Sequence, residues 1–505
     1  MIWGKGAQLV PSKNKGTKER VTEEKKAVVV GGGLAGFASA AVMAERGVEV
    51  VILEKNHYLG GRAGAWTERL EDGTPFEMER GFHAFFRQYY NLRRFMKRID
   101  PGLHNLLPLE DYPLFGPKGD PESFSGLPKH VPWNVLELIH RTPRMSFLDM
   151  MKVNKNRALQ MFGYDPQRTY ARYDNMTAKD YLDSLGFPPD ARDMLFNVFA
   201  HSFFNPEDKF SAADLLMMFH FYFIGNPEGL IFDVLEEPFS TSLWQPLRRY
   251  VEDRGVRILT ERTVTSVEMT NEESFRVHME DSHEPVEGDV CVLSVDVPAL
   301  KSIMEKSPDL TGSPAFKASI DSLDVTLPFA VWRLWTDRAP SSGRAPFAGT
   351  TNLGYLDNIS IYERFEGESR RWSLETGGSV VELHGYAVPE GADEEEIKSN
   401  LKTNMELTYP EMRGVEILED RFILAQDCPS FQPRMTSLRP TTETPVTGLA
   451  LAGDFVRLPF PSALMERAVA SGFMAANNLM EPWNIRPEPI YSIPPKGFLS
   501  WLPTP

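Results

Sequence analysis

The stretch KAVVVGGGLAGFASAAVMAERGVEVVILEKNHYLGGR, residues 26–62, decides the fold class of this chain. It begins with a short apolar run, Ala27 to Val30, which is typical of a buried strand. An alanine-rich helix is expected over 37–46, where Gly47 ends it, and a second apolar strand is expected over 48–53. The pattern therefore predicts a strand–helix–strand unit of the kind found in doubly wound α/β proteins.

The turn between the first strand and the helix has the spacing G-x-G-x-x-G, formed by Gly31, Gly33 and Gly36. In such a turn the first glycine permits the sharp bend, the second lets the backbone approach a diphosphate, and the third lets helix and strand pack closely. The helix N-terminus then offers free N–H groups to the phosphates. Glu54 follows the second strand, where a carboxylate can accept hydrogen bonds from an adenosine ribose. A glycine-rich turn without a ligand would leave Glu54 unexplained, so the sequence predicts a bound dinucleotide.

A second glycine pair, Gly60-Gly61, is followed by Arg62. This pair could carry the backbone past the diphosphate a second time, and the guanidinium of Arg62 suits a phosphate or a flavin edge. A plain turn followed by a surface ion pair is the alternative for these residues.

The other end of the chain carries a related signal. The apolar run 449–452 reads as a buried strand that stops at Gly453-Asp454, and a helix is expected over 463–479 with Ser462 as its N-cap. An aspartate at a strand end can hold a ribityl hydroxyl, and a helix N-terminus can favour an anionic reduced flavin. A cofactor contacted by both ends of the chain must be long, which favours FAD over NAD.

Together these motifs resemble the glutathione-reductase-like flavoproteins, in the branch that holds amine oxidases, protoporphyrinogen oxidases and carotenoid desaturases. The resemblance implies an α/β fold, with a Rossmann FAD-binding domain and an inserted α+β substrate domain built from a mixed β-sheet and a helical section. It also implies that a middle strand, here at Val264, lies against the adenine. The residues that the resemblance assigns to FAD binding are Gly31, Gly33, Gly36, Glu54, Gly61, Arg62, Val264 and Asp454.

The predicted domain order alternates between cofactor and substrate segments. Two terminal tails enclose them, and the first is expected to be flexible because it is short of apolar residues. The segments are a flexible tail (1–25), a first FAD-binding segment (26–95), a helical, membrane-facing substrate region (96–240), a second FAD-binding segment (241–300), the substrate-domain sheet (301–435), a third FAD-binding segment (436–482) and a C-terminal tail (483–505).

Composition excludes several functions. The net charge of −16 argues against nucleic-acid binding, because a phosphate backbone would be repelled. Only two cysteines are present, and the histidines show no metal-ligand spacing, so neither a disulfide framework nor a metal site is expected. Without a signal peptide or a spanning apolar stretch, a cytoplasmic protein is expected, in peripheral contact with a membrane surface.

Two apolar segments point to an oily substrate. Residues 215–224 (LLMMFHFYFI) are a buried core helix, the wall of an apolar tunnel or a patch that dips into a membrane. Residues 497–502 could form a small interfacial foot, or equally a strand or loop packed on the body.

The segment 79–90 (ERGFHAFFRQYY) resembles carotenoid desaturases, and in its longer form the isorenieratene-synthase type of β-ring desaturase/methyltransferase. The resemblance implies hydride transfer from a β-ionone ring to FAD, a methyl shift within the ring, and a second oxidation to an aromatic end group. His83 would then lie near the flavin as a proton acceptor, and Arg62 would assist at the flavin edge. Core packing is the alternative for His83.

Three other functions remain open at this point: a linear carotene desaturase or isomerase, an amine or protoporphyrinogen oxidase, and a flavin-binding protein without turnover. Because no second dinucleotide motif is visible, oxygen or a membrane quinone is the expected electron acceptor.

Overall fold

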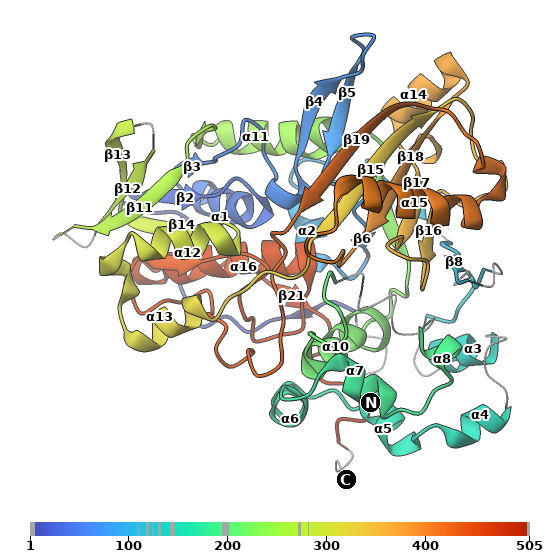
Figure 1. Ribbon diagram of the computed structural model, residues 1–505. Coiled ribbons are helices and arrows are strands. Elements are labelled where there is room, and N and C mark those ends of the chain that lie inside the picture. Colours follow the sequence, from blue (N-terminus) through green and yellow to red (C-terminus); the bar gives the residue numbers. More distant parts are fainter. Residues whose placement is uncertain are drawn as a thin grey trace.

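A computed structural model describes residues 6–501, apart from 110, 118–120, 124, 130–132, 142–146, 194–200, 202, 271–273 and 281. Two large sheets dominate it, one on each side of the molecule in Figure 1, with a group of helices beneath them.

The first sheet is parallel and five-stranded, and it is assembled from segments far apart in the sequence. Its order is β10 (Arg257–Leu259), β3 (Glu49–Leu53), β2 (Lys26–Val30), β14 (Val290–Leu293) and β20 (Leu449–Leu451). The last strand, from near the C-terminus, lies directly beside β14.

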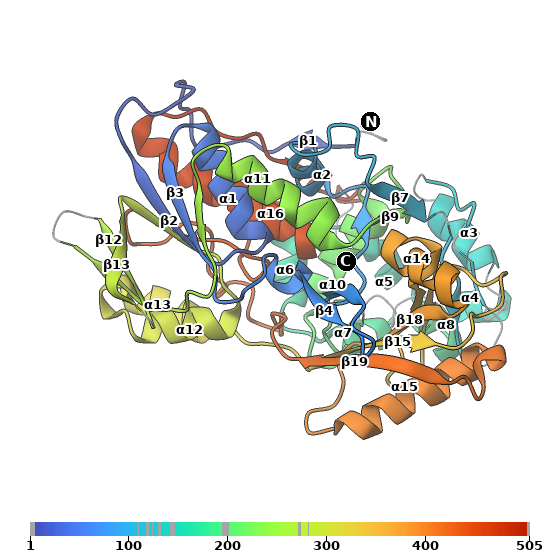
Figure 2. The same cartoon turned by 90° about the horizontal axis from the view of Figure 1, so that it is seen from above.

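Successive side chains along these strands point to opposite faces of the sheet and therefore pack into two different hydrophobic cores. Ala27 and Val29 pack with one cluster, which includes α1 (Leu34–Glu45), α11 (Gln245–Glu252) and α16 (Leu464–Met480). Val28 and Val30 pack with the other, which includes α12 (Val297–Glu305) and α13 (Pro314–Asp321). Figure 2 shows α1, α11 and α16 side by side, with α12 and α13 across the sheet. The predicted strand–helix–strand unit is confirmed, although the helix begins three residues earlier than expected.

A small antiparallel sheet lies beside α12. It contains β11 (Val264–Met269), β12 (Phe275–Met279) and β13 (Ser282–Gly288). Val264 stands at its first position, directly after the loop that leaves β10.

The second large sheet is mixed, as the sequence predicts, since five strands are antiparallel and a sixth pairs in parallel at one edge. Helix α15 (Glu394–Thr408) covers one of its faces, while α14 (Gly367–Thr376), which the sequence did not reveal, packs near β18. The strand order is β19 (Ile417–Ala425), β15 (Phe329–Thr336), β18 (Ser379–Gly385), β17 (Asn358–Ile361), β16 (Phe347–Thr350) and β8 (Leu114–Phe115).

The structure also contains two further small sheets. One is the hairpin of β4 and β5; the other is antiparallel, in the order β6-β9-β7. Their strands are β4 (Ala65–Arg69), β5 (Pro75–Glu79), β6 (Phe85–Phe86), β7 (Leu106–Leu109) and β9 (Phe232–Leu235).

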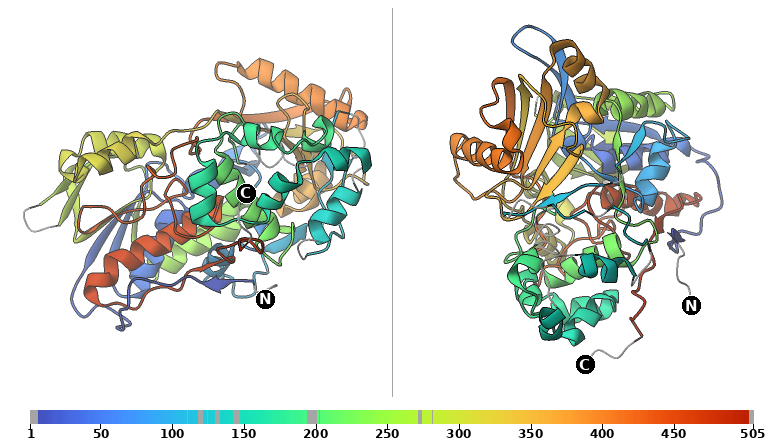
Figure 3. Two further views of the ribbon diagram at one scale, coloured as in Figure 1. Left: turned by 90° about the horizontal axis from the view of Figure 1, so that it is seen from below. Right: turned by 90° about the vertical axis from the view of Figure 1, so that its right-hand side faces the viewer.

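The helical section gathers at one end of the molecule beside the C-terminus (Figure 3). Thr177 caps one of its helices by accepting from the Asp180 N–H at 3.0 Å. The helices are α3 (Trp133–Arg141), α4 (Phe147–Lys152), α5 (Lys155–Met161), α6 (Pro166–Tyr173), α7 (Ala178–Asp183), α8 (Pro189–Arg192) and α10 (Ala212–Phe219), which continues as a π-helical turn, His220–Ile224.

The N-terminal segment, predicted to be a flexible tail, is instead packed against the C-terminal one. β1 (Gln8–Leu9) pairs with β21 (Tyr491–Ser492), and the buried Asn14 side chain donates to the Asn477 carbonyl. Backbone pairing and one buried amide therefore hold the N-terminal segment in place, because its polar sequence lacks the side chains for hydrophobic contacts.

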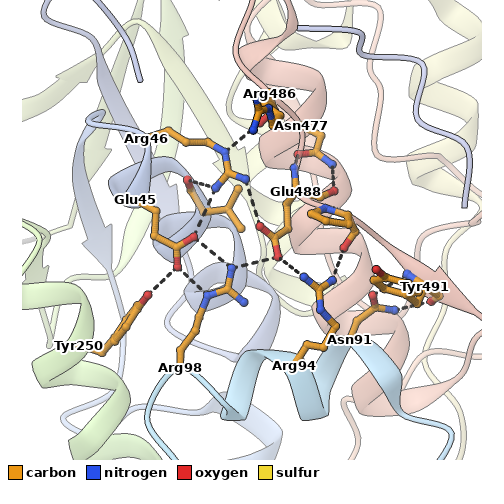
Figure 4. A network of polar contacts seen from close by, with 12 residues as sticks. Glu45, Arg46, Asn91, Arg94, Arg98, Tyr250, Asn477, Arg486, Glu488 and Tyr491 are labelled. Carbon is orange, nitrogen blue, oxygen red and sulfur yellow. Dashed lines mark hydrogen bonds and ion pairs between the residues drawn. The ribbon is translucent and has the colours of Figure 1, made fainter. Parts of the chain in front are cut away.

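A network of charged side chains fixes the C-terminal segment to the parallel-sheet side (Figure 4). Glu488 forms ion pairs with Arg46, Arg94 and Arg98. Arg98 also donates to Glu45 at the end of α1, and Tyr250 donates to the same carboxylate. Helices α1, α11 and α2 (Tyr90–Met96) are thus tied to one another and to the last segment of the chain.

Candidate functional site

The two glycine-rich turns meet at the N-terminus of α1. Gly33 and Gly60 form a parallel bridge, and the Gly60 N–H donates to the Gly32 carbonyl at 2.8 Å. A Cβ added to Gly33 would have the Gly60 oxygen, 3.8 Å away, as its nearest neighbour, and one added to Gly61 would meet only the Gly33 Cα at 3.7 Å. The backbone here borders open space beside free helical N–H groups, which is the shape that a diphosphate needs.

Gly31 and Gly36 are glycines for a different reason. Gly31 has φ +106°, a region that side chains disfavour. A Cβ on Gly36 would overlap the Gly31 carbonyl oxygen and lie 2.7 Å from the Ser294 Oγ. These two positions therefore serve the close packing of strand and helix, whereas Gly33 and Gly61 leave room for a ligand.

Glu54 lies at the end of β3, almost fully buried, and faces the same space. One carboxylate oxygen accepts from the Gly32 N–H at 2.7 Å, and the other accepts from the backbone and side-chain amides of Asn56. Burial raises the pKa of Glu54. The side chain is thus held rigidly, with one lone pair, on the oxygen that accepts from Gly32, left for a ribose hydroxyl.

Val264 borders the same space. The Arg262 N–H donates to the Glu54 carbonyl at 2.9 Å, and this bond brings the start of β11 beside the end of β3. Val264 and Glu54 therefore line one wall, where an adenosine would lie.

Arg62 and Asp454, from opposite ends of the chain, form an ion pair in the cavity wall. Asp454 follows β20 and is buried, while Arg62 is 31% exposed. Arg62 therefore does form an ion pair, as the alternative interpretation proposed, but in the cavity wall rather than at the surface, and its partner is the aspartate that the sequence assigns to the ribityl chain.

Ser462 does not cap α16, contrary to the sequence prediction. Ala463 occupies the N-cap position, and the Ser462 Oγ has no hydrogen-bond partner among the described residues. The Ser462 carbonyl instead accepts from the Arg467 guanidinium, so the backbone turns one residue later than the residue type indicates.

One cavity of about 390 Å³ is bordered by Gly31, Gly33, Glu54, Gly61, Arg62, Val264 and Asp454, whereas Gly36 and Ser462 lie outside its lining. Beyond the glycine turns its walls become aromatic: Phe82 stacks on Phe347 with ring centroids 4.5 Å apart, and Phe86 packs against Phe232. Tyr222 from the π-helical turn also lines it, although most of the run 215–224 is buried core. The run 215–224 is therefore mostly core, while Tyr222 within it is also part of the cavity wall. The aromatic residues of the wall are Phe82, Phe86, Tyr89, Tyr112, Phe203, Phe204, Tyr222, Phe232, Phe329, Phe347 and Tyr386.

His83 lies on the cavity wall, half-buried. Its Nδ1 lies 2.7 Å from the Gly81 carbonyl, so Nδ1 carries the proton and Nε2 keeps its lone pair. Burial lowers the pKa of His83 to about 4, and the neutral ring is therefore the resting form near pH 7. Arg80 pairs with Asp427 and Arg87 with Asp233, rather than with Glu77 or Glu79.

A second polar group on the wall has no counterpart in the sequence analysis. Tyr386, His384 and Asn358 line the cavity, and Glu382 lies behind them with no exposed surface. Glu382, His384 and Tyr386 alternate along one strand and its end, so a period-of-two pattern could have revealed that they share a face.

These features define a flavoprotein, and comparison with known proteins agrees. The chain belongs to the flavin containing amine oxidoreductase family, whose sequence model matches residues 34–480. It is an FAD-dependent oxidoreductase with an FAD-binding domain and a substrate domain. It shares the fold of the wild-type putrescine oxidase bound to putrescine (TM-score 0.65, 14% identity, 91% of this chain and 99% of that one). Cyclohexylamine oxidase from Brevibacterium oxydans has the same fold (TM-score 0.63, 13% identity, 92% of this chain and 99% of that one).

Among related proteins, the chain is 40% identical to the carotenoid phi-ring synthase of Streptomyces griseus, over 95% of this chain and 92% of that protein. It is 28% identical to the carotenoid phi-ring synthase of Chlorobaculum tepidum, with the same coverage. A probable zeta-carotene desaturase of Synechococcus elongatus is 25% identical over 90% of this chain and 98% of that protein.

Proposed function

We propose that this oxidoreductase converts the β-ring of a carotenoid into an aromatic phi-type end group, with a methyl shift inside the ring. One observation carries the proposal: a single cavity joins the glycine turns to a wall of aromatic side chains. The 40% identity to a carotenoid phi-ring synthase supports the same substrate class.

FAD fits the polar end of the cavity. We assign the diphosphate to the open backbone at Gly33 and Gly61, and the ribose to Glu54, with Val264 at the adenine. Gly31 and Gly36 shape the turn, while Arg62 and Asp454 hold the ribityl and flavin end. When bound there, FAD supplies a two-electron acceptor for hydride.

The aromatic end of the cavity suits a polyene and its ring. Phe82, Phe86 and Phe232 offer flat apolar faces, which exclude water and can stabilise the positive charge that develops on a substrate. Nε2 of His83 is available as a proton acceptor on the same wall.

The substrate would arrive from a membrane surface. No helix within the described residues of the chain is both long and apolar enough to cross a bilayer. Large apolar side chains are nevertheless exposed on the helical section and near the C-terminus: Trp133 (64%), Met151 (64%), Leu159 (49%) and Trp501 (72%). These lie on α3, α4, α5 and the last segment, at one end of the molecule (Figure 3). We propose a cytoplasmic protein that rests on the membrane through this end, with oxygen or a quinone as electron acceptor.

Pigment analysis tests the proposal. We expect cells that accumulate β-carotene to form aromatic-ring carotenoids when they express this chain, and cells that accumulate lycopene or phytoene to keep their pigments. Changes confined to linear carotenes would favour a linear desaturase or isomerase instead. Oxidation of putrescine or a porphyrinogen by the purified protein, with β-carotene unchanged, would assign it to the amine or porphyrinogen oxidases.

A further inference from the structure

Three polar side chains form a hydrogen-bonded line from the cavity into the substrate-domain sheet. The Tyr386 hydroxyl lies 3.0 Å from His384 Nδ1, and His384 Nε2 lies 2.7 Å from a carboxylate oxygen of Glu382. Tyr386 is half-buried on the cavity wall, His384 is 2% exposed, and Glu382 is fully buried. A tyrosine, a histidine and a carboxylate in this order are arranged like a catalytic triad. The histidine can accept the proton of the tyrosine, and the carboxylate orients the histidine.

The direction of each hydrogen follows from the partners. Because a carboxylate only accepts, His384 Nε2 carries the ring proton and Nδ1 must accept from the Tyr386 hydroxyl. The Asn358 side-chain amide donates to the Tyr386 oxygen at 2.7 Å. Tyr386 therefore has its own proton directed at His384 and one lone pair left for a group in the cavity.

Glu382 is anchored as a carboxylate. It accepts from the Arg333 guanidinium at 2.8 Å, from the Tyr362 hydroxyl at 2.9 Å and from the Phe82 N–H at 3.0 Å. Burial acts to raise the pKa of Glu382, but Arg333 above all outweighs it and lowers that pKa to about 2. A fixed negative charge at this point stabilises a positive charge on His384.

The tyrosine end of the line borders the same cavity as Arg62 and Asp454. The Phe204 ring contacts Tyr386 with centroids 4.7 Å apart and also contacts Phe329, over which the Arg80 guanidinium lies. Arg80 pairs with Asp427, and both border the cavity together with Arg62. Contacts between cavity-lining residues thus connect Tyr386 to the part of the wall that holds Arg80 and Asp427.

We infer that Tyr386 is a catalytic residue that accepts a proton from the substrate ring, that His384 takes up the proton of Tyr386, and that Glu382 is a positioning residue that orients His384 and stabilises its positive charge. The inference rests on the proposed function. Aromatisation removes two hydride–proton pairs from each ring: bound FAD would take up one hydride at a time, with oxygen or a quinone reoxidising it before the second, and a proton must leave each resulting cation as a ring double bond forms. In this step the Tyr386 oxygen takes the ring proton while its own proton passes to His384 Nδ1, which leaves His384 cationic beside Glu382. Burial raises the pKa of Tyr386, so the two transfers occur together rather than through a free phenolate.

The test compares Tyr386→Phe, His384→Gln and a control, Tyr355→Phe, in the FAD-loaded protein with β-carotene. Tyr355 lies on the same domain and donates to a surface carboxylate, Glu396, outside the cavity. General bases contribute roughly 10²–10⁴-fold to rate. We expect Tyr386→Phe to lower kcat for the aromatic product by at least about 100-fold, with less than about a threefold change in KM. Partly desaturated, non-aromatic rings should accumulate, and Tyr355→Phe should match the wild type.

A second measurement does not depend on turnover. In the ¹⁵N NMR spectrum of histidine-labelled wild-type protein, the signal that His384→Gln removes should show a protonated Nε2 and an unprotonated Nδ1. Tyr386→Phe should shift the Nδ1 resonance, because its donor is gone.

The results distinguish failure of the proposed function from failure of the proton-accepting role of Tyr386. If the wild type leaves β-carotene unchanged, the proposed function fails, and the NMR result alone then decides whether the hydrogen-bonded line exists. If the wild type forms aromatic rings and Tyr386→Phe does so within about threefold of its rate, the proton-accepting role of Tyr386 is wrong while the function stands. A protonated Nδ1 on His384 would also overturn the proton-accepting role of Tyr386. So would a Tyr386→Phe variant whose KM rises by the same factor as its kcat falls, without accumulated intermediates.

Discussion

Gly33 and Gly36 belong to one motif, and the structure predicts opposite consequences for replacing each with alanine. At Gly33 the added methyl group enters open space, and the backbone φ of −85° is ordinary for alanine. At Gly36 the methyl group overlaps the Gly31 carbonyl and lies 2.7 Å from the Ser294 Oγ, well inside the roughly 3.5 Å of favourable contact. The first change should therefore affect the cofactor and the second the fold.

The magnitudes follow from these contacts. Gly33→Ala places alanine at a helix N-cap, which costs up to about 1 kcal/mol, and the stiffer unfolded chain returns about 0.4–1 kcal/mol. The apoprotein should therefore keep its stability within about 1 kcal/mol, while FAD affinity falls at least tenfold, about 1.4 kcal/mol, because the methyl group occupies the diphosphate's place. Gly36→Ala forces strand and helix apart, so the apoprotein should lose about 1–3 kcal/mol or more.

Urea unfolding of the apoproteins and titration of each with FAD, followed by flavin fluorescence, measure the two quantities separately. Gly343→Ala is the matched control, since this exposed glycine has no neighbour within 4 Å of an added Cβ. Wild-type FAD affinity in Gly33→Ala would refute our placement of the diphosphate, and wild-type apoprotein stability in Gly36→Ala would refute the packing argument.

Three further predictions concern Asp454 in the flavin wall, the buried Glu466 and the exposed tryptophans. Asp454→Ala should lower FAD affinity at least tenfold, because Arg62 loses its partner in the flavin wall, and the flavin-to-protein absorbance ratio checks this. Burial raises the pKa of Glu466 to about 8, so the folded state holds an extra proton between pH 4.5 and 8 and stability falls as pH rises through that range. Urea unfolding should show that Glu466→Gln removes about 1.4 kcal/mol per pH unit of that slope, whereas an unchanged slope would contradict the raised pKa. Replacing Trp133 and Trp501 with serine should reduce sedimentation with zwitterionic lipid vesicles while flavin content stays constant, and undiminished sedimentation would rule out that surface.

The elements of the fold that could be predicted from sequence are those with local signals. The strand–helix–strand unit follows from periodicity and glycine spacing within 37 residues. The sequence places Arg62 and Asp454 at the same cofactor, but it does not predict that they pair with each other across 392 residues, because no local pattern encodes a contact at that distance.

The misses have physical causes. The first 25 residues look disordered by composition, yet Asn14 and β1 are held by backbone partners that composition does not reveal. The line from Tyr386 to Glu382 was missed because an alternating strand does not state which of its faces borders a cavity.

The parallel sheet has a consequence for how the protein is made. Strand β14 lies between β2 and β20, and β20 is not synthesised until residue 451. While the ribosome is still translating the preceding 150 or so residues, the nascent chain exposes an unpaired, apolar edge of β14. Messages truncated before that codon should yield aggregating polypeptides that chaperones retain, because the parallel sheet is complete only once residue 451 has been translated.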